Sequence, residues 1–299
     1  MKTTVAVFGL GSMGYGMAQS CLRAGLDVYG FDVAAEPVAR FAADGGKTGP
    51  LAEVAPTLGA AVVVVLNAAQ VESVLFGSDG IVPHLQAGTV VLACATVPPE
   101  FARDMAARCA AAGVLYLDAP ISGGSVKAAE GRLSIMASGS AEAFAAAETI
   151  LNATSETVFR LGDAAGAGSA MKAVNQLLAG VHIATMAEAL TFGVTQGIAP
   201  ETFVNVITRC AGTSWMLENR APHIVAGDYT PHSQVTIWPK DLGIVLETAK
   251  ASGFQAPITE TALAQYMRAV DMGLGGEDDA AVAKVYAEQA GVSLPEGTS

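Results

Sequence analysis

The stretch Thr3-Thr-Val-Ala-Val-Phe-Gly9-Leu-Gly-Ser-Met-Gly14 decides the fold of the first half of the chain. It begins as a β-branched and apolar run, typical of a buried parallel strand, and passes directly into the glycine pattern GxGxxG. A helical pattern follows as far as Ala24 and stops at Gly25. The next strand-like run, Asp27 to Asp32, ends in an acid. A strand, a glycine turn, a helix and a second strand in this order predict a Rossmann-like domain.

The glycine turn has the chemistry of a dinucleotide site. Gly9, Gly11 and Gly14 permit a tight turn and a close approach of the backbone to a ligand. The helix that follows offers free N–H groups and the positive end of its dipole to a pyrophosphate. Leu10 and Met13 belong to the same turn, so we expect them to line the bound cofactor.

The acid at the end of the second strand predicts which cofactor binds. Asp32 lies 21 residues after Gly11, where a carboxylate accepts hydrogen bonds from the adenosine ribose hydroxyls. The same carboxylate repels the 2′-phosphate of NADP, and the next residues, Val33-Ala-Ala35, supply no arginine to hold one. The sequence therefore predicts NAD over NADP.

Length and charge exclude several classes of protein. The chain has 299 residues, enough for about two domains. Its net charge is −12 and it has no cluster of Lys or Arg, so we expect no nucleic-acid partner. Hydrophobic residues make up 52%, but the most apolar run, Ala60 to Leu66, is far shorter than the roughly 18 residues that a membrane span needs. The N-terminus has no signal-peptide layout, so we expect a soluble protein with no membrane partner.

The cysteines indicate a reducing compartment. Cys21, Cys94, Cys109 and Cys210 are far apart and have neither a CxxC pattern nor the spacing of metal ligands. Buried free thiols in the cytoplasm explain them best. We therefore predict a cytoplasmic protein without a metal site.

Further strand-like runs separated by alanine-rich helical stretches extend the α/β pattern. They are residues 61–66, 89–95, 114–118, 133–137 and 157–161. This alternation predicts a doubly wound sheet, in which ligands bind beyond the carboxyl ends of the strands. Leu66, Asn67 and Thr96 stand at two such ends, so we expect them beside the cofactor. Pro98-Pro-Glu100 is also a normal helix start, which is compatible with this role of Thr96.

A second glycine-rich turn follows the strand that ends at Asp118. In Asp118-Ala-Pro-Ile-Ser-Gly-Gly124, a serine and two glycines expose backbone N–H groups that can bind an anion such as a carboxylate. The alternative interpretation is an ordinary turn with no ligand. Ser122, Gly123 and Gly124 are thus candidates for binding a substrate carboxylate.

The pattern becomes helical beyond Gly166 and remains so. We place the domain boundary near residue 162, which gives an α/β domain over 1–162 and an all-α domain over 163–299. A long apolar helical run starts near Gly168, where we expect the two domains to meet. Such an apolar helical half also favours a homodimer or homotetramer.

Lys172 and Asn175 are the candidate catalytic residues. Residues three apart on a helix face the same way, so the two side chains can address one small molecule. Burial of Lys172 in a cleft would lower its pKa from about 10.4 toward roughly 7–8, which suits a general base. The alternative for such a lysine is an ordinary solvated side chain. His182 lies two turns further along, about 10 Å away, so we interpret it as structural.

These segments together resemble the β-hydroxyacid dehydrogenase family, which includes 3-hydroxyisobutyrate dehydrogenase and tartronate semialdehyde reductase. Nearly the whole chain takes part in the resemblance. Its signatures are Gly9 to Gly14, Asp118 to Gly124, Gly166 to Asn175, and Lys240-Asp-Leu242. Four signatures in the family's order make the resemblance specific.

The resemblance implies roles for particular residues. Lys172 matches the catalytic lysine of the family, and Asn175 matches the residue that assists it. The segment Ser122 to Gly124 matches the part that holds the substrate carboxylate. Thr96 and Lys240 match positions near the nicotinamide, so Lys240 joins the expected cofactor-binding residues.

The expected reaction is the oxidation of a short sugar acid at C2 to the 2-oxo acid, with NAD as the hydride acceptor. Within the family the likeness is greatest to members that act on four-carbon sugar acids, and it depends on residues 125–139, 214–223 and 228–233. The alternative is a relative acting on 3-hydroxyisobutyrate, glycerate or tartronate semialdehyde.

Two features leave the details of the substrate site open. Gln176 stands where the family often has a second asparagine, and Trp238-Pro239 precedes Lys240. Trp215, Asn219 and Arg220 are candidates for recognising the polyol end of a substrate, but core packing and a helix surface explain them equally well.

Overall fold

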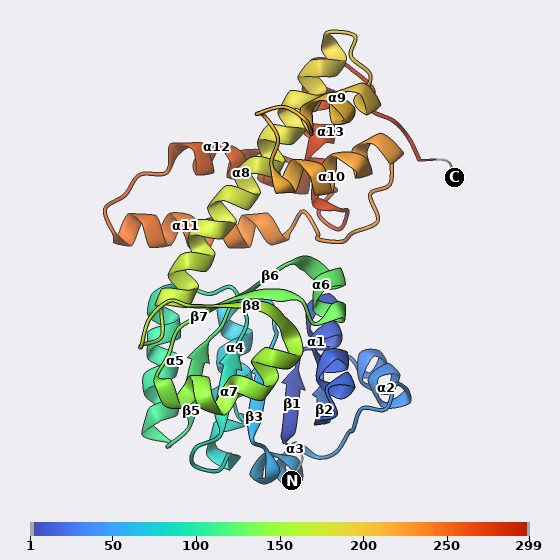
Figure 1. Ribbon diagram of the computed structural model, residues 1–299. Helices are drawn as coiled ribbons and strands as arrows, with labels where there is room; N and C mark the ends of the chain where they lie inside the picture. The colour runs from blue at the N-terminus through green and yellow to red at the C-terminus, as the bar shows by residue number, and fades with distance from the viewer. Residues whose placement is uncertain (1–2, 298–299) are drawn as a thin grey trace. The chain divides into compact units, whose positions relative to one another are not determined.

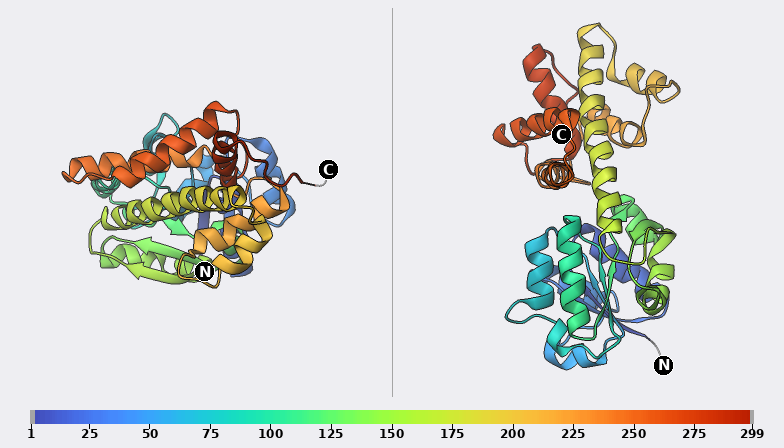
Figure 2. Two further views of the ribbon diagram at one scale, coloured as in Figure 1. Left: turned by 90° about the horizontal axis from the view of Figure 1, so that it is seen from above. Right: turned by 90° about the vertical axis from the view of Figure 1, so that its left-hand side faces the viewer.

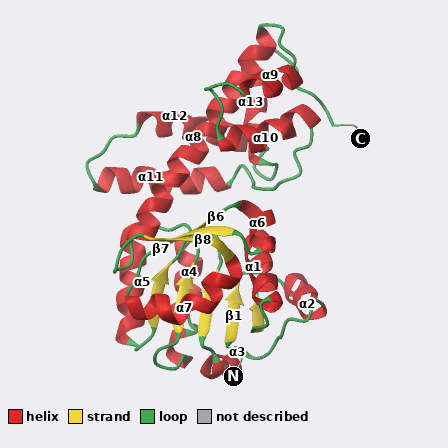
Figure 3. Ribbon diagram, in the orientation of Figure 1, coloured by secondary structure: helices red, strands yellow, loops and turns green. Residues whose placement is uncertain are grey.

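A computed structural model of the chain describes residues 3–297 and divides it into two compact units, residues 1–172 and 173–299. The first unit alternates strands and helices and the second is helical (Figures 1 and 3). The Rossmann-like and all-α fold classes are thereby confirmed. The boundary near residue 162 stays a prediction.

A parallel five-stranded sheet forms the centre of the first unit, in the order β2-β1-β3-β4-β5. The strands are β1 (Thr4–Phe8), β2 (Asp27–Phe31), β3 (Ala60–Val63), β4 (Val90–Ala93) and β5 (Leu115–Asp118). β1 and β3 to β5 are almost entirely buried and rich in Val, Leu and Ala, as expected for strands covered on both faces. The strand order reverses between β1 and β3, and at such a point a crevice opens beyond the strand ends.

Helices cover both faces of this sheet (Figure 2). One face packs against α1 (Ser12–Arg23), α2 (Ala35–Ala43), α6 (Gly124–Glu130) and α7 (Ala141–Thr154). The other packs against α3 (Leu51–Val54), α4 (Ala68–Phe76) and α5 (Pro99–Ala111). Two short 3-10 turns, η1 (Ala55–Thr57) and η2 (Val82–His84), complete this layer.

The later strands of this unit form a separate sheet, which differs from the single sheet that the sequence suggests. β6 (Ile121–Ser122), β7 (Leu133–Ala137) and β8 (Ser155–Arg160) lie in the order β6-β7-β8. β6 pairs antiparallel with β7, with Ser122 opposite Ser134. The sequence pattern missed β6 because it is only two residues long and follows Pro120 directly.

The helical unit packs around the long helix α8 (Ala167–Thr195). Its other helices are α9 (Pro200–Ile207), α10 (Trp215–Ala226), α11 (Ile237–Ala251), α12 (Pro257–Asp271) and α13 (Val282–Ala290), with the 3-10 turn η3 (Asp279–Ala281). Trp238 stacks on Tyr266 in this core, and the Tyr266 hydroxyl donates a 2.8 Å hydrogen bond to the Gly180 carbonyl of α8.

α8 has one property that short apolar runs in the sequence do not reveal. Among the described residues it is the one helix long and apolar enough to cross a membrane by length and composition alone. The core helix of a packed domain meets the same two criteria. Ile183, Met186, Ala187 and Leu190 of α8 are fully or almost fully buried in the core of the helical unit, so this part of α8 is a core helix.

Candidate active site

The glycine turn between β1 and α1 has the shape of a dinucleotide cradle. Gly9 has a φ of +92°, and a Cβ on Gly14 would lie 1.9 Å from the Gly9 carbonyl oxygen, so the turn closes only with glycines. A Cβ on Gly11, in contrast, would meet no protein atom within 4 Å. Gly11 caps α1 without a side-chain hydrogen bond, and the first turn contains no acid. The turn thus presents backbone N–H groups to open space, where a pyrophosphate fits.

Asp32 is held against this turn. Its Oδ2 accepts a 2.7 Å hydrogen bond from the Leu10 N–H, and its Oδ1 accepts one of 2.9 Å from the Ala34 N–H. A carboxylate has about four lone-pair sites, so each oxygen can still accept a hydrogen bond from a ribose hydroxyl. The residues present therefore fit the adenosine half of NAD.

The second glycine turn lies next to the first because α6 packs directly on α1. A Cβ on Gly16 of α1 would lie 2.6 Å from the Ala129 nitrogen of α6, so only a glycine permits this approach. Gly123 and Gly124 have φ values of +137° and +77°, conformations that side chains disfavour. A cavity of about 340 Å³ contains Gly11 and Ser12 of the first turn and Ser125 of α6 among its lining residues. The candidate cofactor and carboxylate turns thus lie close together.

Asp118 fixes the start of α8. Only 1% of this residue is exposed, and its Oδ2 accepts hydrogen bonds from the backbone N–H groups of Gly166 and Ser169, each 2.9 Å long. Ser138 also donates to Oδ2, at 3.2 Å, and accepts a 2.9 Å hydrogen bond from the Gly168 N–H. Gly168 lies so close to this group that a Cβ would be 2.4 Å from the Met136 carbonyl oxygen. The carboxylate therefore satisfies N–H groups that a helix start otherwise leaves without a partner.

Lys172 follows this anchored turn and is buried, with 8% of the residue exposed. Asn175 stands three residues later on the same helix and is partly buried. The interpretation of Lys172 as a solvated surface lysine is therefore wrong. Helical periodicity alone does not reveal this burial.

A continuous chain of polar contacts runs through the helical unit beside Asn175. The Asn175 amide nitrogen donates a 2.9 Å hydrogen bond to Gln176 Oε1. Gln176 Nε2 donates one of 2.5 Å to Asp241 Oδ2, and Asp241 Oδ1 lies 2.6 Å from Lys240 Nζ. Asp241 is thus a partner of two side chains.

Arg220 is part of a buried structural cluster. Its Nε lies 2.5 Å from Asp279 Oδ1, and the Trp238 indole N–H donates a 3.0 Å hydrogen bond to Asp279 Oδ2. Asn219 accepts a hydrogen bond from the same guanidinium. Trp215 is 57% exposed. Of the candidates for the polyol end, Arg220 therefore has a structural partner, and Trp215 is accessible.

The remaining predicted cofactor residues stand at strand ends. Leu66 is 60% exposed, and its backbone N–H donates a 2.8 Å hydrogen bond to Gln70 Oε1. Asn67 caps α4 by accepting a 2.9 Å hydrogen bond from the Gln70 N–H. Thr96 is half-buried in the loop after β4. Their contact with a cofactor stays a prediction.

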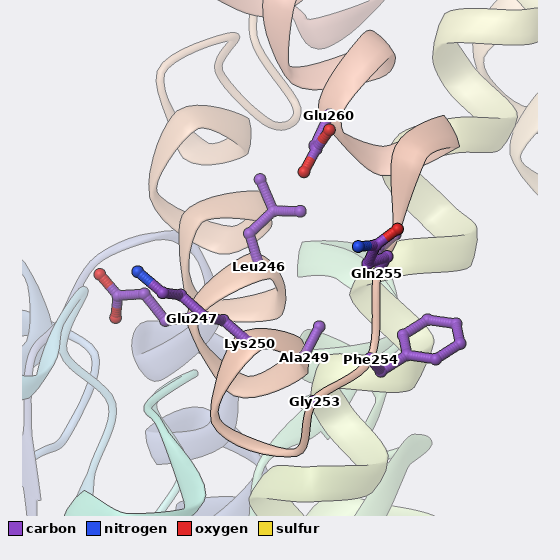
Figure 4. A pocket seen from close by; sticks show the side chains of 9 residues that line it. Leu246, Glu247, Ala249, Lys250, Gly253, Phe254, Gln255 and Glu260 are labelled. Carbon is purple, nitrogen blue, oxygen red and sulfur yellow. The ribbon is translucent and has the colours of Figure 1, made fainter.

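Another cavity, of about 440 Å³, lies in the helical unit at the turn between α11 and α12 (Figure 4). Lys250, Phe254 and Glu260 line it, and it contains none of the residues predicted to bind cofactor or substrate. Within residues 3–297, no three His, Cys, Asp or Glu side chains form a group that could hold a metal ion.

Asp118, Gln176 and Asp241 are the side chains whose observed partners sequence reasoning did not find. The sequence marks Asp118 only as the end of a strand, and Gln176 only as a departure from the family pattern. The signal for Asp118 lies in the helix start itself, where the N–H groups of Gly166 and Ser169 need an acceptor. The pairing of Gln176 with Asp241 joins residues far apart in the chain, and no local pattern indicates it.

Comparison with known proteins agrees with this geometry. Residues 4–162 match the family described as the NAD-binding domain of 6-phosphogluconate dehydrogenase. Residues 166–286 match the NAD-binding domain of NADP-dependent 3-hydroxyisobutyrate dehydrogenase. The chain is 49% identical to L-threonate dehydrogenase of Cupriavidus necator over 296 residues, 99% of each chain. It is 45% identical to L-threonate dehydrogenase of Escherichia coli K12, covering 97% of this chain and 96% of the relative.

A solved structure of 3-hydroxyisobutyrate dehydrogenase from Salmonella typhimurium has the same fold. It superposes with a TM-score of 0.90 at 45% identity, covering 95% of this chain and all of that one. Fold and site together define an NAD-binding dehydrogenase with a Rossmann-like domain and a helical domain. The chain belongs to the β-hydroxyacid dehydrogenase family, whose members include 3-hydroxyisobutyrate dehydrogenase. The expectations of the family, of an oxidoreductase and of NAD are thereby confirmed.

Proposed function

We propose that the protein oxidises L-threonate at C2 to the 2-oxo acid, using NAD. The single observation that carries the proposal is the burial of Lys172 directly after the helix turn that Asp118 holds. The identity of 42–49% to several L-threonate dehydrogenases over nearly their whole length supports this substrate. Family members at lower identity act on other acids by name, among them 2-(hydroxymethyl)glutarate at 36%.

The reaction removes a hydride from C2 and a proton from its hydroxyl group. NAD bound along the glycine turn supplies the hydride acceptor. Lys172 Nζ, in its neutral form, takes the hydroxyl proton. Asn175 hydrogen-bonds the same hydroxyl group or holds the lysine. With the hydride and the proton both removed, the C2 carbon becomes a carbonyl.

Backbone groups and side chains hold the remainder of the reactants. The N–H groups of Ser122, Gly123 and Gly124 bind the substrate carboxylate. Gly9, Leu10, Gly11, Met13 and Gly14 line the pyrophosphate, and Asp32 binds the ribose. Leu66, Asn67, Thr96 and Lys240 complete the cofactor site. No step in this scheme needs a metal ion, because the lysine takes the proton and backbone dipoles bind the carboxylate.

Further properties of the proposed enzyme follow from its composition. We place the enzyme in the cytoplasm, where free thiols such as the buried Cys21, Cys94 and Cys109 stay reduced. We assign it a homodimeric or homotetrameric state, because α8 exposes Met171, Val174 and Leu178 on one side. The domain boundary is placed near residue 162, between the two family matches.

Initial rates of NADH formation test the substrate. The panel contains L-threonate, D-threonate, erythronate, D-glycerate and 3-hydroxyisobutyrate at equal concentrations. We expect kcat/KM for L-threonate to exceed the others by at least about tenfold, because a site whose polar groups are placed for particular hydroxyl groups discriminates against acids that lack them or hold them in another configuration. A higher kcat/KM for another acid would assign that acid in its place and leave the role of Lys172 intact.

A further inference from the structure

We propose that Gln176 and Asp241 are positioning residues that fix the orientation of the Asn175 amide, so that its carbonyl oxygen, and not its NH₂ group, faces Lys172 Nζ, the proposed base. The proposal rests on the proposed function, because it specifies what Asn175 contributes there. It assigns Lys240 a second task as the ion-pair partner of Asp241.

The argument starts from the carboxylate. Asp241 is 2% exposed and pairs with the Lys240 ammonium at 2.6 Å. An ionised carboxylate only accepts hydrogen bonds. The group of Gln176 that lies 2.5 Å from Asp241 Oδ2 must therefore be its NH₂ group.

The direction of the second hydrogen bond follows from the first. With its NH₂ group on Asp241, Gln176 presents its carbonyl oxygen to Asn175. Only the NH₂ group of Asn175 can donate to that oxygen, at 2.9 Å. The Asn175 carbonyl then points away from Gln176. A single buried charge thus fixes the orientation of two amides in series.

The orientation matters for the chemistry. The substrate hydroxyl has a single hydrogen, and that hydrogen goes to Lys172 Nζ. The Asn175 carbonyl oxygen accepts a hydrogen bond from Lys172 Nζ, which leaves the nitrogen lone pair for the hydroxyl proton and holds the Lys172 ammonium after the transfer. An NH₂ group in that place could accept no hydrogen bond from the ammonium. Glutamine is one methylene longer than the asparagine that the family often has at position 176, and it reaches Asp241 here.

The first test removes the amide link. Gln176→Met keeps the volume and deletes both hydrogen bonds, and Gln265→Met is its matched control. Gln265 lies on α12 in the same unit and has a buried Oε1 without a hydrogen-bond partner. We expect kcat to fall about tenfold for Gln176→Met, less than the ~10²-fold that a 1 Å misplacement costs. The control variant keeps kcat within about twofold.

The second test moves the charge from one end of the link to the other. Asp241→Asn leaves no obligatory acceptor, and Gln176→Glu places two carboxylates 2.5 Å apart. The double variant Gln176→Glu/Asp241→Asn restores one carboxylate, now at position 176, which accepts from the new amide at position 241 and from Asn175 alike. Each single variant is expected to lose about tenfold in kcat, and the double variant to return within about threefold of the wild type. A double variant no faster than the slower single variant would overturn the proposal.

A third measurement is independent of turnover. One side-chain N–H proton of Asn175 is bonded to Gln176, so in two-dimensional ¹H–¹⁵N spectra it should exchange with solvent more slowly than its geminal partner. Gln176→Met should abolish this difference, and the double variant should keep it. Equal exchange of both protons in the wild type would refute the proposed series of hydrogen bonds from Asp241 through Gln176 to Asn175, even if the enzyme oxidises every acid in the panel. A wild type inactive on all the acids would refute the proposed function. The exchange of the Asn175 amide protons would then still decide whether Gln176 and Asp241 fix the orientation of Asn175.

Discussion

The Ser169 hydroxyl donates a 2.7 Å hydrogen bond to Asp118 Oδ1, and the backbone N–H of the same residue donates one of 2.9 Å to Oδ2. One carboxylate at the end of β5 thus binds both the side chain and the main chain of the first turn of α8. Lys172 stands three residues further on. The position of the proposed base therefore depends on a residue that does not itself react.

Asp118→Asn should destabilise the protein and lower its activity. Burial raises the pKa of Asp118, and the hydrogen bonds from Ser169, Gly166 and Ser138 oppose that rise. The asparagine has one acceptor oxygen where the carboxylate has two, and it carries no charge to strengthen the hydrogen bonds that it accepts, so we expect the free energy of unfolding to fall by about 3 kcal/mol. Urea unfolding measures it. The exposed Asp163→Asn in the preceding loop is the control, and an equal effect of the two variants would contradict the assignment.

Lys172→Ala should abolish turnover and leave cofactor binding in place. Loss of a general base lowers kcat by about 10²–10⁴-fold. The glycine turn and Asp32 are untouched, so the Kd for NADH, measured by fluorescence, should change less than about threefold. Lys250→Ala, at an exposed lysine of α11, is the control. Retention of most of the wild-type kcat by Lys172→Ala would rule out the lysine as the base.

Asp32→Ala should weaken the preference for NAD. It removes the ribose acceptor and the charge that repels a 2′-phosphate, so we expect KM for NAD to rise about tenfold and KM for NADP to fall. Steady-state kinetics with both cofactors measure the change, with Asp79→Ala in the loop after α4 as the control. Equal catalytic efficiency of the wild type with NAD and NADP would show that Asp32 does not discriminate.

Asp278 should make the protein acid-sensitive in one defined range. Burial alone would raise its pKa, but hydrogen bonds from His223 and from the backbone N–H groups of His232 and Ala280 outweigh it and lower the pKa from 3.8 to about 2. A pKa lowered by folding contributes stability above 3.8 that is lost as the pH falls toward 2. Urea unfolding at several pH values should show a steeper loss over this range for the wild type than for Asp278→Asn. Parallel curves would contradict the shift.

Most of the fold could be predicted from local sequence patterns. The strand, glycine turn, helix and acid of residues 3–32 fix the Rossmann-like unit because each piece has a physical requirement that few sequences meet. Lys172 and Asn175 were identifiable from their spacing and from the family resemblance. The NAD cradle required only the residues near Gly11 and Asp32.

Contacts between distant parts of the chain could not be predicted in the same way. Asp118 meets Ser169 and Gln176 meets Asp241 only after folding, and no period in the sequence encodes either pair. The separate sheet of β6, β7 and β8 escaped notice because pairing partners follow from tertiary packing and not from strand propensity.

The continuity of α8 limits how this chain can change in evolution. Lys172 and Asn175 lie on one helix of 29 residues, and each residue advances a helix by about 100°. A single inserted or deleted residue between them would rotate Asn175, Gln176 and all later positions of α8 by more than a quarter turn with respect to Lys172. Surface loops of the protein can therefore lengthen or shorten freely, while this helix tolerates substitution but no change of length between these two residues.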